Sequence, residues 1–167
     1  MTRDILIRTR NFAILVLIQA LIFNQIHLFG YATAHIYLVF LLKLPRFTSR
    51  NEMLIWAFLF GLVVDIFGNT PGINTCAATA MAFVRNNLLD AFTQKGSADD
   101  FIPSVHTIGW SGYTTYSLFN LLIFYTALYM LELFTIQYPV TLLISVLSST
   151  ALTMLFTLVI ECFTRKR

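Results

Sequence analysis

Residues 61–82 read GLVVDIFGNTPGINTCAATAMA, and the rest of the chain can be placed around them. The stretch has the pattern of one apolar helix that ends, a turn of few residues, and a second helix that begins. Small or polar residues recur every three or four positions, which places them on one face of each helix. They are Ala57, Gly61, Asp65 and Gly68 before the turn and Gly72, Thr75, Ala78, Thr79 and Ala82 after it. The two backbones are therefore predicted to pack closely as an antiparallel pair.

The turn itself contains residues typical of helix ends. Gly68 is expected to end the first helix in a left-handed conformation, with Asn69 following it in the turn. Thr70 and Pro71 are expected to be the N-cap and the first residue of the second helix. Asp65 would then lie about one turn from that N-terminus. Unpaired N–H groups and the helix dipole stabilise a carboxylate there.

Asp65 has two interpretations, because charged groups at membrane depth are rare and face other helices. In the first, its carboxylate is a strut that ties the two helix ends together. In the second, it is a proton or cation relay, which usually needs another ionisable group at similar depth. The nearest candidates, His35 and Glu132, belong to other predicted helices. We favour the strut, because the sequence gives no second group at a matching depth.

Composition places the chain among integral membrane proteins. Of its 167 residues, 57% are hydrophobic and only 11% are charged, and the mean hydropathy is +0.75. A soluble domain cannot bury that much apolar surface, whereas helices that satisfy their own backbone groups can stand in lipid. The first apolar run, from Phe12 to Phe23, lacks a small-residue cleavage pattern and is counted as a span. We expect an all-α fold with one transmembrane domain over residues 1–167.

Six apolar runs predict a bundle of six transmembrane helices. Four of the runs approach or exceed the roughly 20 residues that cross the hydrocarbon layer. The second run is short, and by length alone a re-entrant or interfacial piece fits equally well. The predicted spans cover about residues 11–27, 31–44, 51–67, 71–92, 113–134 and 139–163.

The distribution of basic residues favours six spans over five. With the N-terminus inside, all eleven Lys and Arg residues fall in cytoplasmic segments, and the outer turns near Gly30, Gly68 and Gln137 contain none. This asymmetry is the positive-inside pattern. Removing the second span would place eight of the eleven outside. Both termini are therefore expected in the cytoplasm.

The predicted loops restrict where function can lie. The outer turns are too short to form a domain, so any activity on that side is expected to come from helix ends. The longest loop, residues 93–112, is predicted inside and mixes charged residues with Phe101, Ile102 and Trp110. These apolar residues can anchor the loop at the headgroups or meet a cytoplasmic partner. We favour the anchor.

A row of hydroxyl residues follows the last predicted helix at intervals of four: Thr141, Ser145, Ser149, Thr153 and Thr157. Such a row can line a polar path, but a helix-packing seam is the commoner use, and we favour packing. It is also the longest polar seam that the chain offers to another protein. Ser145 and Ser149 are therefore the candidate contacts for the transmembrane helix of a partner, and the fifth predicted helix is the alternative contact.

The sequence contains no recognisable catalytic or metal-binding constellation. It has no Gly-rich phosphate loop, no nucleophile with a base at suitable spacing and no paired carboxylates. His27 and His106 are predicted on opposite sides of the bilayer, as are Cys76 and Cys162, which argues against a metal site and an intrachain disulfide. Anionic lipid explains the inner positive charge without nucleic acid. We predict a protein that is not an enzyme and has no cofactor.

The run FGLVVDIFGNTPGINTCAATAMAFVR, residues 60–85, resembles the central segment of the MreD family of bacterial rod shape-determining proteins. In that family a GL-x-x-D stretch leads through a short turn to a PG or PLG and an apolar helix. The resemblance extends over the whole chain, including GYATAHIYLVFLLKLPR at residues 30–46. Further matches are Tyr37, Leu44, Pro45, Pro103, Gly109 and Tyr116, and departures are Ala34, Asn86 and Asn120.

The resemblance implies a non-enzymatic scaffold or adaptor of the cell-elongation machinery in the bacterial cytoplasmic (inner) membrane, with a role in rod cell shape. The implied partners are the single-span protein MreC, the actin-like MreB, and the peptidoglycan polymerase RodA with its transpeptidase. A homodimer is a further option.

The MreD fold is similar to the substrate-binding subunits of energy-coupling-factor vitamin transporters, so a vitamin-binding subunit is the main alternative. Those subunits dock through small residues of the first helix, where this chain has only Ala13 and Ala20, seven residues apart. The outer face also offers little polar surface for recognition. A third hypothesis, a channel or proton-coupled carrier, rests on Asp65 and the hydroxyl row alone.

Overall fold

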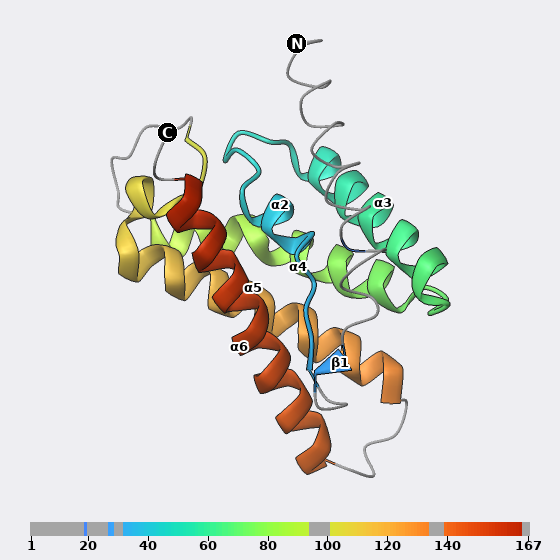
Figure 1. Cartoon of the computed structure of the whole chain (residues 1–167). Helices are drawn as coiled ribbons and strands as arrows, with labels where there is room; N and C mark the ends of the chain where they lie inside the picture. Colours follow the sequence, from blue (N-terminus) through green and yellow to red (C-terminus); the bar gives the residue numbers. More distant parts are fainter. Residues whose placement is uncertain (1–18, 20–26, 29–31, 94–100, 134–138, 165–167) are drawn as a thin grey trace.

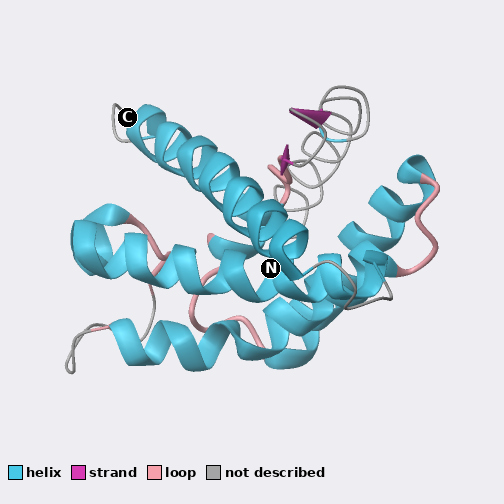
Figure 2. Cartoon of the chain, turned by 90° about the horizontal axis from the view of Figure 1, so that it is seen from below, coloured by secondary structure: helices cyan, strands magenta, loops and turns pink. Residues whose placement is uncertain are grey.

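The structure is a computed structural model that describes residues 19, 27–28, 32–93, 101–133 and 139–164. Most of these residues are helical (Figure 2). The first predicted span, residues 11–27, lies outside the described residues except for Gln19 and the backbone of His27. The pair Ala13 and Ala20 lies outside them as well.

The described elements follow one another as two short strands and five helices. Three of the helices, at residues 50–68, 105–132 and 140–163, are long and apolar enough to cross a membrane, which is consistent with an all-α membrane protein. The elements are β1 (His27–Leu28), β2 (Ala32–Thr33), α2 (Leu38–Leu42), α3 (Arg50–Gly68), α4 (Ile73–Phe92), α5 (Val105–Leu133) and α6 (Pro139–Thr164).

Helices α3, α4 and α6 lie close to the spans expected from the sequence, whereas α5 begins earlier. The loop predicted over residues 93–112 is helical from Val105 onwards. A kink at Gly109, with φ 81° and ψ 165°, separates this first turn from the rest of α5. Only glycine adopts such a conformation without strain. The predicted span from Tyr113 therefore covers only the part of α5 that follows the kink.

The prediction of a continuous helix over residues 31–44 is wrong. The chain pairs Ala32 and Thr33 with β1 in an antiparallel hairpin, runs without regular structure to Tyr37, and forms only the five-residue helix α2. Figure 1 shows this piece between α6 and α3. It is almost entirely buried by its neighbours. Irregular backbone at membrane depth is tolerated where other parts of the protein cover it. Here neighbouring elements bury the segment, so it does not need to form a continuous helix.

Side chains of other elements satisfy the backbone of this extended segment, residues 33–37. Gln19 donates to the carbonyl of Ala34 at 3.0 Å and accepts from the N–H of Ile36 at 2.8 Å. The N–H of Thr33 donates to Ser149 Oγ at 3.1 Å. The Tyr125 hydroxyl donates to the Thr33 carbonyl at 2.9 Å. Each bond replaces one that a helix would have made within itself.

A fully buried arginine holds the next piece of the chain. Arg85 of α4 donates to the carbonyl of Leu42 at 2.9 Å and to that of Leu44, just past the end of α2. The Tyr116 hydroxyl donates to the same Leu42 carbonyl at 3.2 Å. These carbonyls would otherwise be unpaired acceptors of the helix end. Arg85 therefore acts as a C-terminal cap supplied from a neighbouring helix.

An ion pair closes the same end of the bundle. Lys43 Nζ lies 2.7 Å from Glu161 Oε2 of α6, and the Glu161 side chain is only 6% exposed. The other carboxylate oxygen accepts the N–H of Val105 at 3.1 Å, where α5 begins. Glu161 thus joins the segment after α2 to both long C-terminal helices.

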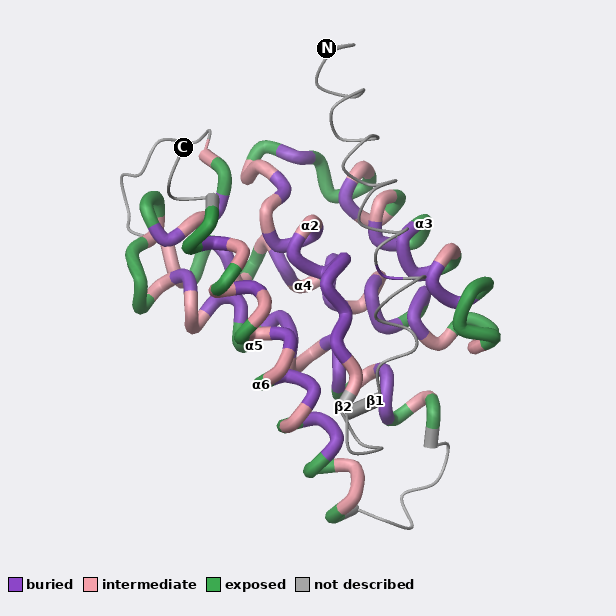
Figure 3. Tube along the Cα trace, in the orientation of Figure 1, coloured by how far each residue is buried: buried purple, intermediate pink, exposed green. Residues whose placement is uncertain are grey.

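The core lies where α4, α5 and α2 meet, and α3 and α6 flank it (Figure 3). Large aromatic side chains from three elements fill it, among them Tyr37, Phe60 and Phe124. The outer faces of α3 and α6 carry exposed Ile, Leu, Val and Phe side chains. In a membrane these faces meet lipid, so their exposure is the expected arrangement.

Candidate functional site

The turn between α3 and α4 uses different capping residues from those predicted. Gly68 is the last residue of α3, and Asn69 adopts the left-handed conformation with φ 53° and ψ 37°. Gly72, with φ 81°, is the N-cap of α4, which begins at Ile73. The predictions of Gly68 as the left-handed residue and of Thr70 and Pro71 as the helix start are therefore wrong. Asparagine also tolerates the left-handed region, which explains the shift by one residue.

Asp65 supplies the cap that Gly72 lacks. Its Oδ1 accepts the N–H of Asn74 and its Oδ2 the N–H of Thr75, both at 2.9 Å. These are the second and third residues of α4, whose N–H groups a capping side chain normally satisfies. The hydroxyls of Thr70 and Thr75 and the Asn74 amide also donate to the carboxylate. The five bonds join the C-terminus of α3 to the N-terminus of α4, as a strut would.

Gly61 allows the two helices to approach at this point. A Cβ on Gly61 would lie 2.4 Å from the Thr75 Cα and 2.8 Å from the Asn74 carbonyl oxygen. Ala57 and Ala78 are fully buried in the same contact. The small-residue faces predicted from the sequence therefore meet, and their contact fixes the distance over which Asp65 reaches α4.

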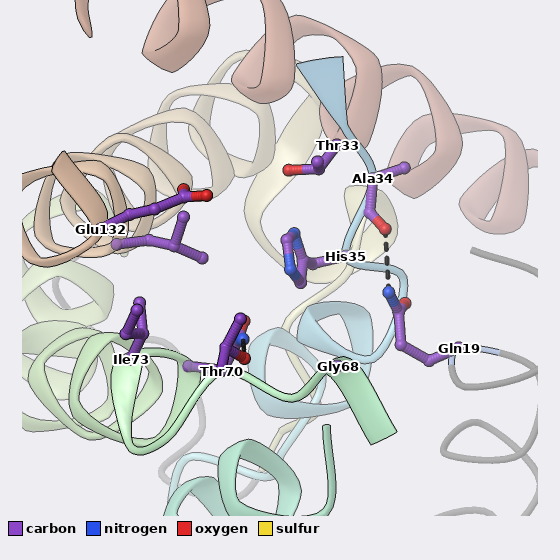
Figure 4. Close-up of a pocket in the computed structure, with 10 residues that line it drawn as sticks. Gln19, Thr33, Ala34, His35, Gly68, Thr70, Ile73 and Glu132 are labelled. Carbon is purple, nitrogen blue, oxygen red and sulfur yellow. Dashed lines mark hydrogen bonds between the residues drawn. The ribbon is translucent and has the colours of Figure 1, made fainter. Parts of the chain in front are cut away.

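A cavity of about 110 Å³ lies beside this turn, bounded by the extended segment, the start of α4 and the end of α5 (Figure 4). We call it the turn cavity. Apolar groups from Ala34, Ile73 and Leu128 cover part of its wall. Its polar lining consists of Gln19, Thr33, His35, Thr70, Asn74 and Glu132. In the sequence these residues come from four separate stretches.

Asn74 connects Asp65 with the turn cavity. Its side-chain nitrogen donates to Asp65 Oδ1 at 3.1 Å and to Thr70 Oγ1 at 3.2 Å. Its side-chain oxygen is buried and has no hydrogen-bond partner within the described residues. Asn74 is itself only 6% exposed. A buried acceptor without a donor is unfavourable, and here it belongs to a cavity-lining residue.

The cavity also contains the two ionisable residues that the sequence could not place relative to Asp65. His35 and Glu132 line it together with Thr70 and Asn74, both of which donate to the Asp65 carboxylate. The His35 ring lies against Tyr125, with Nδ1 3.3 Å from the tyrosine oxygen. The strut contacts and a group of ionisable residues therefore occupy the same end of the bundle.

Charge is divided between the two ends of the described bundle. The lysine and arginine residues described are Lys43, Arg46, Arg50 and Arg85, and all contact the end where α3 begins and α4 and α6 finish. At the opposite end, where the turn cavity lies, the described charged residues are Asp65 and Glu132. That end therefore has a negative electrostatic character.

Ser145 and Ser149 face the interior of the chain. They are 5% and 0% exposed, and Ser149 Oγ lies 2.7 Å from the Tyr129 hydroxyl oxygen while accepting the N–H of Thr33. Thr153 lies against Tyr125 in the same row. The prediction that these serines meet the helix of a partner is corrected, because they are inaccessible to one. Within the row, Ser149 and Thr153 contact the extended segment.

Sequence reasoning did not identify Gln19, Thr33 and Asn74 as site residues. Polar residues in apolar runs are the only local signal, and this signal does not separate a cavity-lining residue from one that bonds backbone. Among the described residues, no three His, Cys, Asp or Glu side chains are placed to hold a metal ion.

Comparisons with known proteins gave no match: no family model, curated protein or solved structure is significantly similar to this chain.

Proposed function

We propose that this chain is a non-enzymatic adaptor of the MreD type, which presents membrane-embedded helix surfaces to the proteins of the bacterial cell-elongation machinery. The observation that carries the proposal is the α3–α4 pair. Three residues of the stretch that carries the resemblance, Gly61, Asp65 and Gly72, make the contacts and the cap that build that pair. Motif residues that serve one local structure support shared architecture over chance similarity of apolar runs.

The described connections also support a role within the membrane. The turn between α3 and α4 contains four residues, from Asn69 to Gly72. Such a turn gives no room for an outer domain, so contacts with partners fall to helix surfaces. In lipid, helices associate through close packing and polar contacts more than through apolar area alone.

The proposed topology keeps six passes with both termini in the cytoplasm, and the second pass is now made by the extended segment with α2. Thr33 contacts Ser149, and Lys43 pairs with Glu161 twelve residues further along α6. Twelve helical residues rise about 18 Å. The segment therefore follows α6 through much of the bilayer thickness, which supports a crossing by a discontinuous element.

A groove between α3 and α4 is the surface that we assign to the single-span, MreC-like partner. It encloses about 500 Å³ and is lined by Phe58, Leu62 and Ile66 of α3 together with Gly72 and Cys76 at the start of α4. Large apolar side chains on one wall and small residues on the other suit the ridge of a transmembrane helix. This groove replaces the hydroxyl row of α6 as the predicted contact.

Co-purification tests the proposal. The chain, expressed with an MreC-like protein and extracted in mild detergent, should retain that protein. Leu62→Trp, which fills the groove, should reduce retention by about tenfold or more, while Leu147→Trp on the exposed face of α6 serves as the matched control. Loss of the partner from both variants, or from neither, would contradict the assignment of the groove. Absence of the partner from wild-type preparations would contradict the adaptor function.

The turn cavity favours the second candidate function, the substrate-binding subunit of a vitamin transporter. Its polar lining is suited to recognising a small molecule. Its volume of about 110 Å³ is small beside the roughly 300–1,000 Å³ of pockets that bury ligands of drug size. A vitamin co-purifying with the chain, together with transporter ATPase subunits, would favour this function over the adaptor.

A further inference from the structure

The groove between α3 and α4 ends at a negative charge that no described residue neutralises. Asp65 is one of the residues that line it. The carboxylate accepts five hydrogen bonds and donates none, as an ionised carboxylate does. All five donors, from Thr70, Asn74 and Thr75, are neutral groups. No lysine or arginine among the described residues lies at this end of the bundle, so the bonds stabilise the charge without cancelling it.

The two helix ends at this turn do not supply the missing positive charge. The N-terminus of α4 carries about half a positive elementary charge, and the C-terminus of α3 carries about half a negative one. These partial charges largely offset each other, which leaves the turn with the charge of Asp65. The last turn of α3 contains no basic residue, although cations are favoured there. The basic residues outside the described ranges fall in segments predicted on the cytoplasmic side.

The apolar wall of the groove determines where the side chains of a partner helix would lie. Phe58, Leu62 and Ile66 follow one another at intervals of four along α3 and are 48%, 39% and 70% exposed. Eight helical residues rise about 12 Å, so the wall accommodates roughly two turns of a neighbouring helix. It ends one residue past Asp65, at the turn that Figure 1 shows at the edge of the molecule. A helix that fills the groove therefore brings its next residues to the charged turn.

We propose that the single-span partner assigned to this groove carries a lysine or arginine at the outer end of its transmembrane helix, directly after the apolar residues that fill the groove. The inference rests on the proposed function, because it names the chemistry of the partner at that site. Lysine and arginine extend along apolar surface while the charged group stays at the interface. The exposed Asn69 side chain, which also lines the groove, offers that group a neutral acceptor.

A basic residue at this position also distinguishes the partner from other membrane helices. Basic residues are enriched on the cytoplasmic side of membrane proteins, so one directly outside a span is unusual. A helix with a neutral residue there gains nothing from the Asp65 charge, and a helix with an acidic residue is repelled. The apolar wall therefore provides contact area, and the charged turn provides specificity.

The test places opposite charges at Asn69 and measures the binding of a purified MreC-like protein by titration in mild detergent at low salt. Asn69→Lys supplies the missing cation within the chain and repels a basic residue of the partner. It should bind at least about tenfold more weakly than Asn69→Glu. Both variants replace the same left-handed residue, so the backbone strain is similar. Equal affinities of the two variants would overturn the proposal.

The thermal unfolding midpoint excludes a folding artefact, because the same charges should act on folding in the opposite direction. A lysine near Asp65 and the C-terminus of α3 is favourable, and a glutamate there is unfavourable. Asn69→Lys should therefore unfold at a higher temperature than Asn69→Glu while binding the partner more weakly. A higher midpoint for Asn69→Glu would mean that the turn is not negative, and the proposal would fail.

Asn51 provides the matched control in the first turn of the same helix, where it is exposed like Asn69. Eighteen helical residues span about 27 Å, well beyond the Debye length of roughly 10 Å at 0.1 M salt. Asn51→Lys and Asn51→Glu should therefore bind the partner equally. A difference as large as that at Asn69 would show that overall charge, and not the turn, determines the affinity.

The partner is tested by replacing the first basic residue beyond the outer end of its span with glutamine. Its affinity for the wild-type chain should fall about tenfold, and the difference between Asn69→Lys and Asn69→Glu should disappear. Persistence of that difference, or a partner with no basic residue at this position, would overturn the proposal.

Leu62→Trp separates failure of this inference from failure of the proposed function. If it expels the partner while the charges at Asn69 have no effect, the groove is the docking site and only the inference about charge fails. If Leu62→Trp retains the partner, the groove assignment fails as well. A phospholipid or a second copy of the chain that is lost from Leu62→Trp, with the partner retained, would be the occupant of the groove instead.

Discussion

Gly61 lies so close to Thr75 that a Cβ on the glycine would stand 2.4 Å from the threonine Cα. Because the nearest atoms are backbone, no side-chain rotation can relieve the overlap. Gly61→Ala should therefore force α3 and α4 apart and lower the free energy of unfolding by about 1–3 kcal/mol, the range of overpacked cores. Thermal unfolding in detergent measures the effect. Ala151→Val adds bulk on the exposed face of α6 and should leave the midpoint nearly unchanged.

Asp65 should tolerate an amide better than an aliphatic side chain, but neither fully. Both carboxylate oxygens accept backbone N–H groups, and Asn retains only one acceptor oxygen. Asp65→Asn should lose about 1–3 kcal/mol, the usual cost of one unsatisfied buried group, and Asp65→Leu considerably more. Chemical unfolding of the two purified variants provides the comparison. If Asp65→Asn abolished proton or cation transfer while stability and yield stayed at wild-type values, the relay interpretation would replace the strut.

Arg85 should not be replaceable by lysine. One ammonium nitrogen cannot reproduce the planar fork that contacts the carbonyls of Leu42 and Leu44 together. Arg85→Lys should therefore loosen the chain around α2. Maleimide labelling of a cysteine placed at Leu42, in a background without the native cysteines, should become several-fold faster. Arg50→Lys, at an exposed arginine that packs on the Phe83 ring, is the control. Unchanged labelling in Arg85→Lys would mean that the cap is dispensable.

Ser149→Leu should damage the fold even when the chain is expressed alone. The serine hydroxyl bonds both Thr33 and Tyr129, and its position is fully buried. The added bulk and the lost bonds should together lower the free energy of unfolding by about 2–4 kcal/mol. Ser148→Leu, one position along, has a hydroxyl that bonds only its own helix and should be milder. Normal accumulation of Ser149→Leu with selective loss of a partner would restore the partner interface to this row.

The spacing of residues in the sequence predicted the structure correctly where the deciding contacts are made by residues close together in the chain. The spacing of Ala57, Gly61 and Asp65 predicted the face that meets α4, because helix geometry alone decides which residues share a face. Apolar runs likewise predicted α3, α4 and α6 to within a few residues. The capping residues shifted by one or two positions, since Asn69 and Gly72 compete with Gly68 and Thr70 for the same backbone conformations.

The extended segment could not be predicted for a different reason. An apolar run such as residues 31–44 gives the same signal whether it is helical or covered by other helices. The covering hydroxyls of Tyr125, Ser149 and Thr153 lie 90 or more residues away in the sequence. The turn cavity is non-local in the same sense. No short pattern brings Gln19, Asn74 and Glu132 together.

The dependence of the extended segment on distant side chains also determines when it can enter the bilayer during synthesis. Its backbone partners on α5 and α6 are made between 90 and 118 residues later. At about 5–20 residues per second, a ribosome needs roughly 5–20 seconds to produce them. Until then the segment would bring orphaned N–H and C=O groups into hydrocarbon. It is therefore translated well before the helices that bury it, and its backbone groups need water or another protein as partners in between.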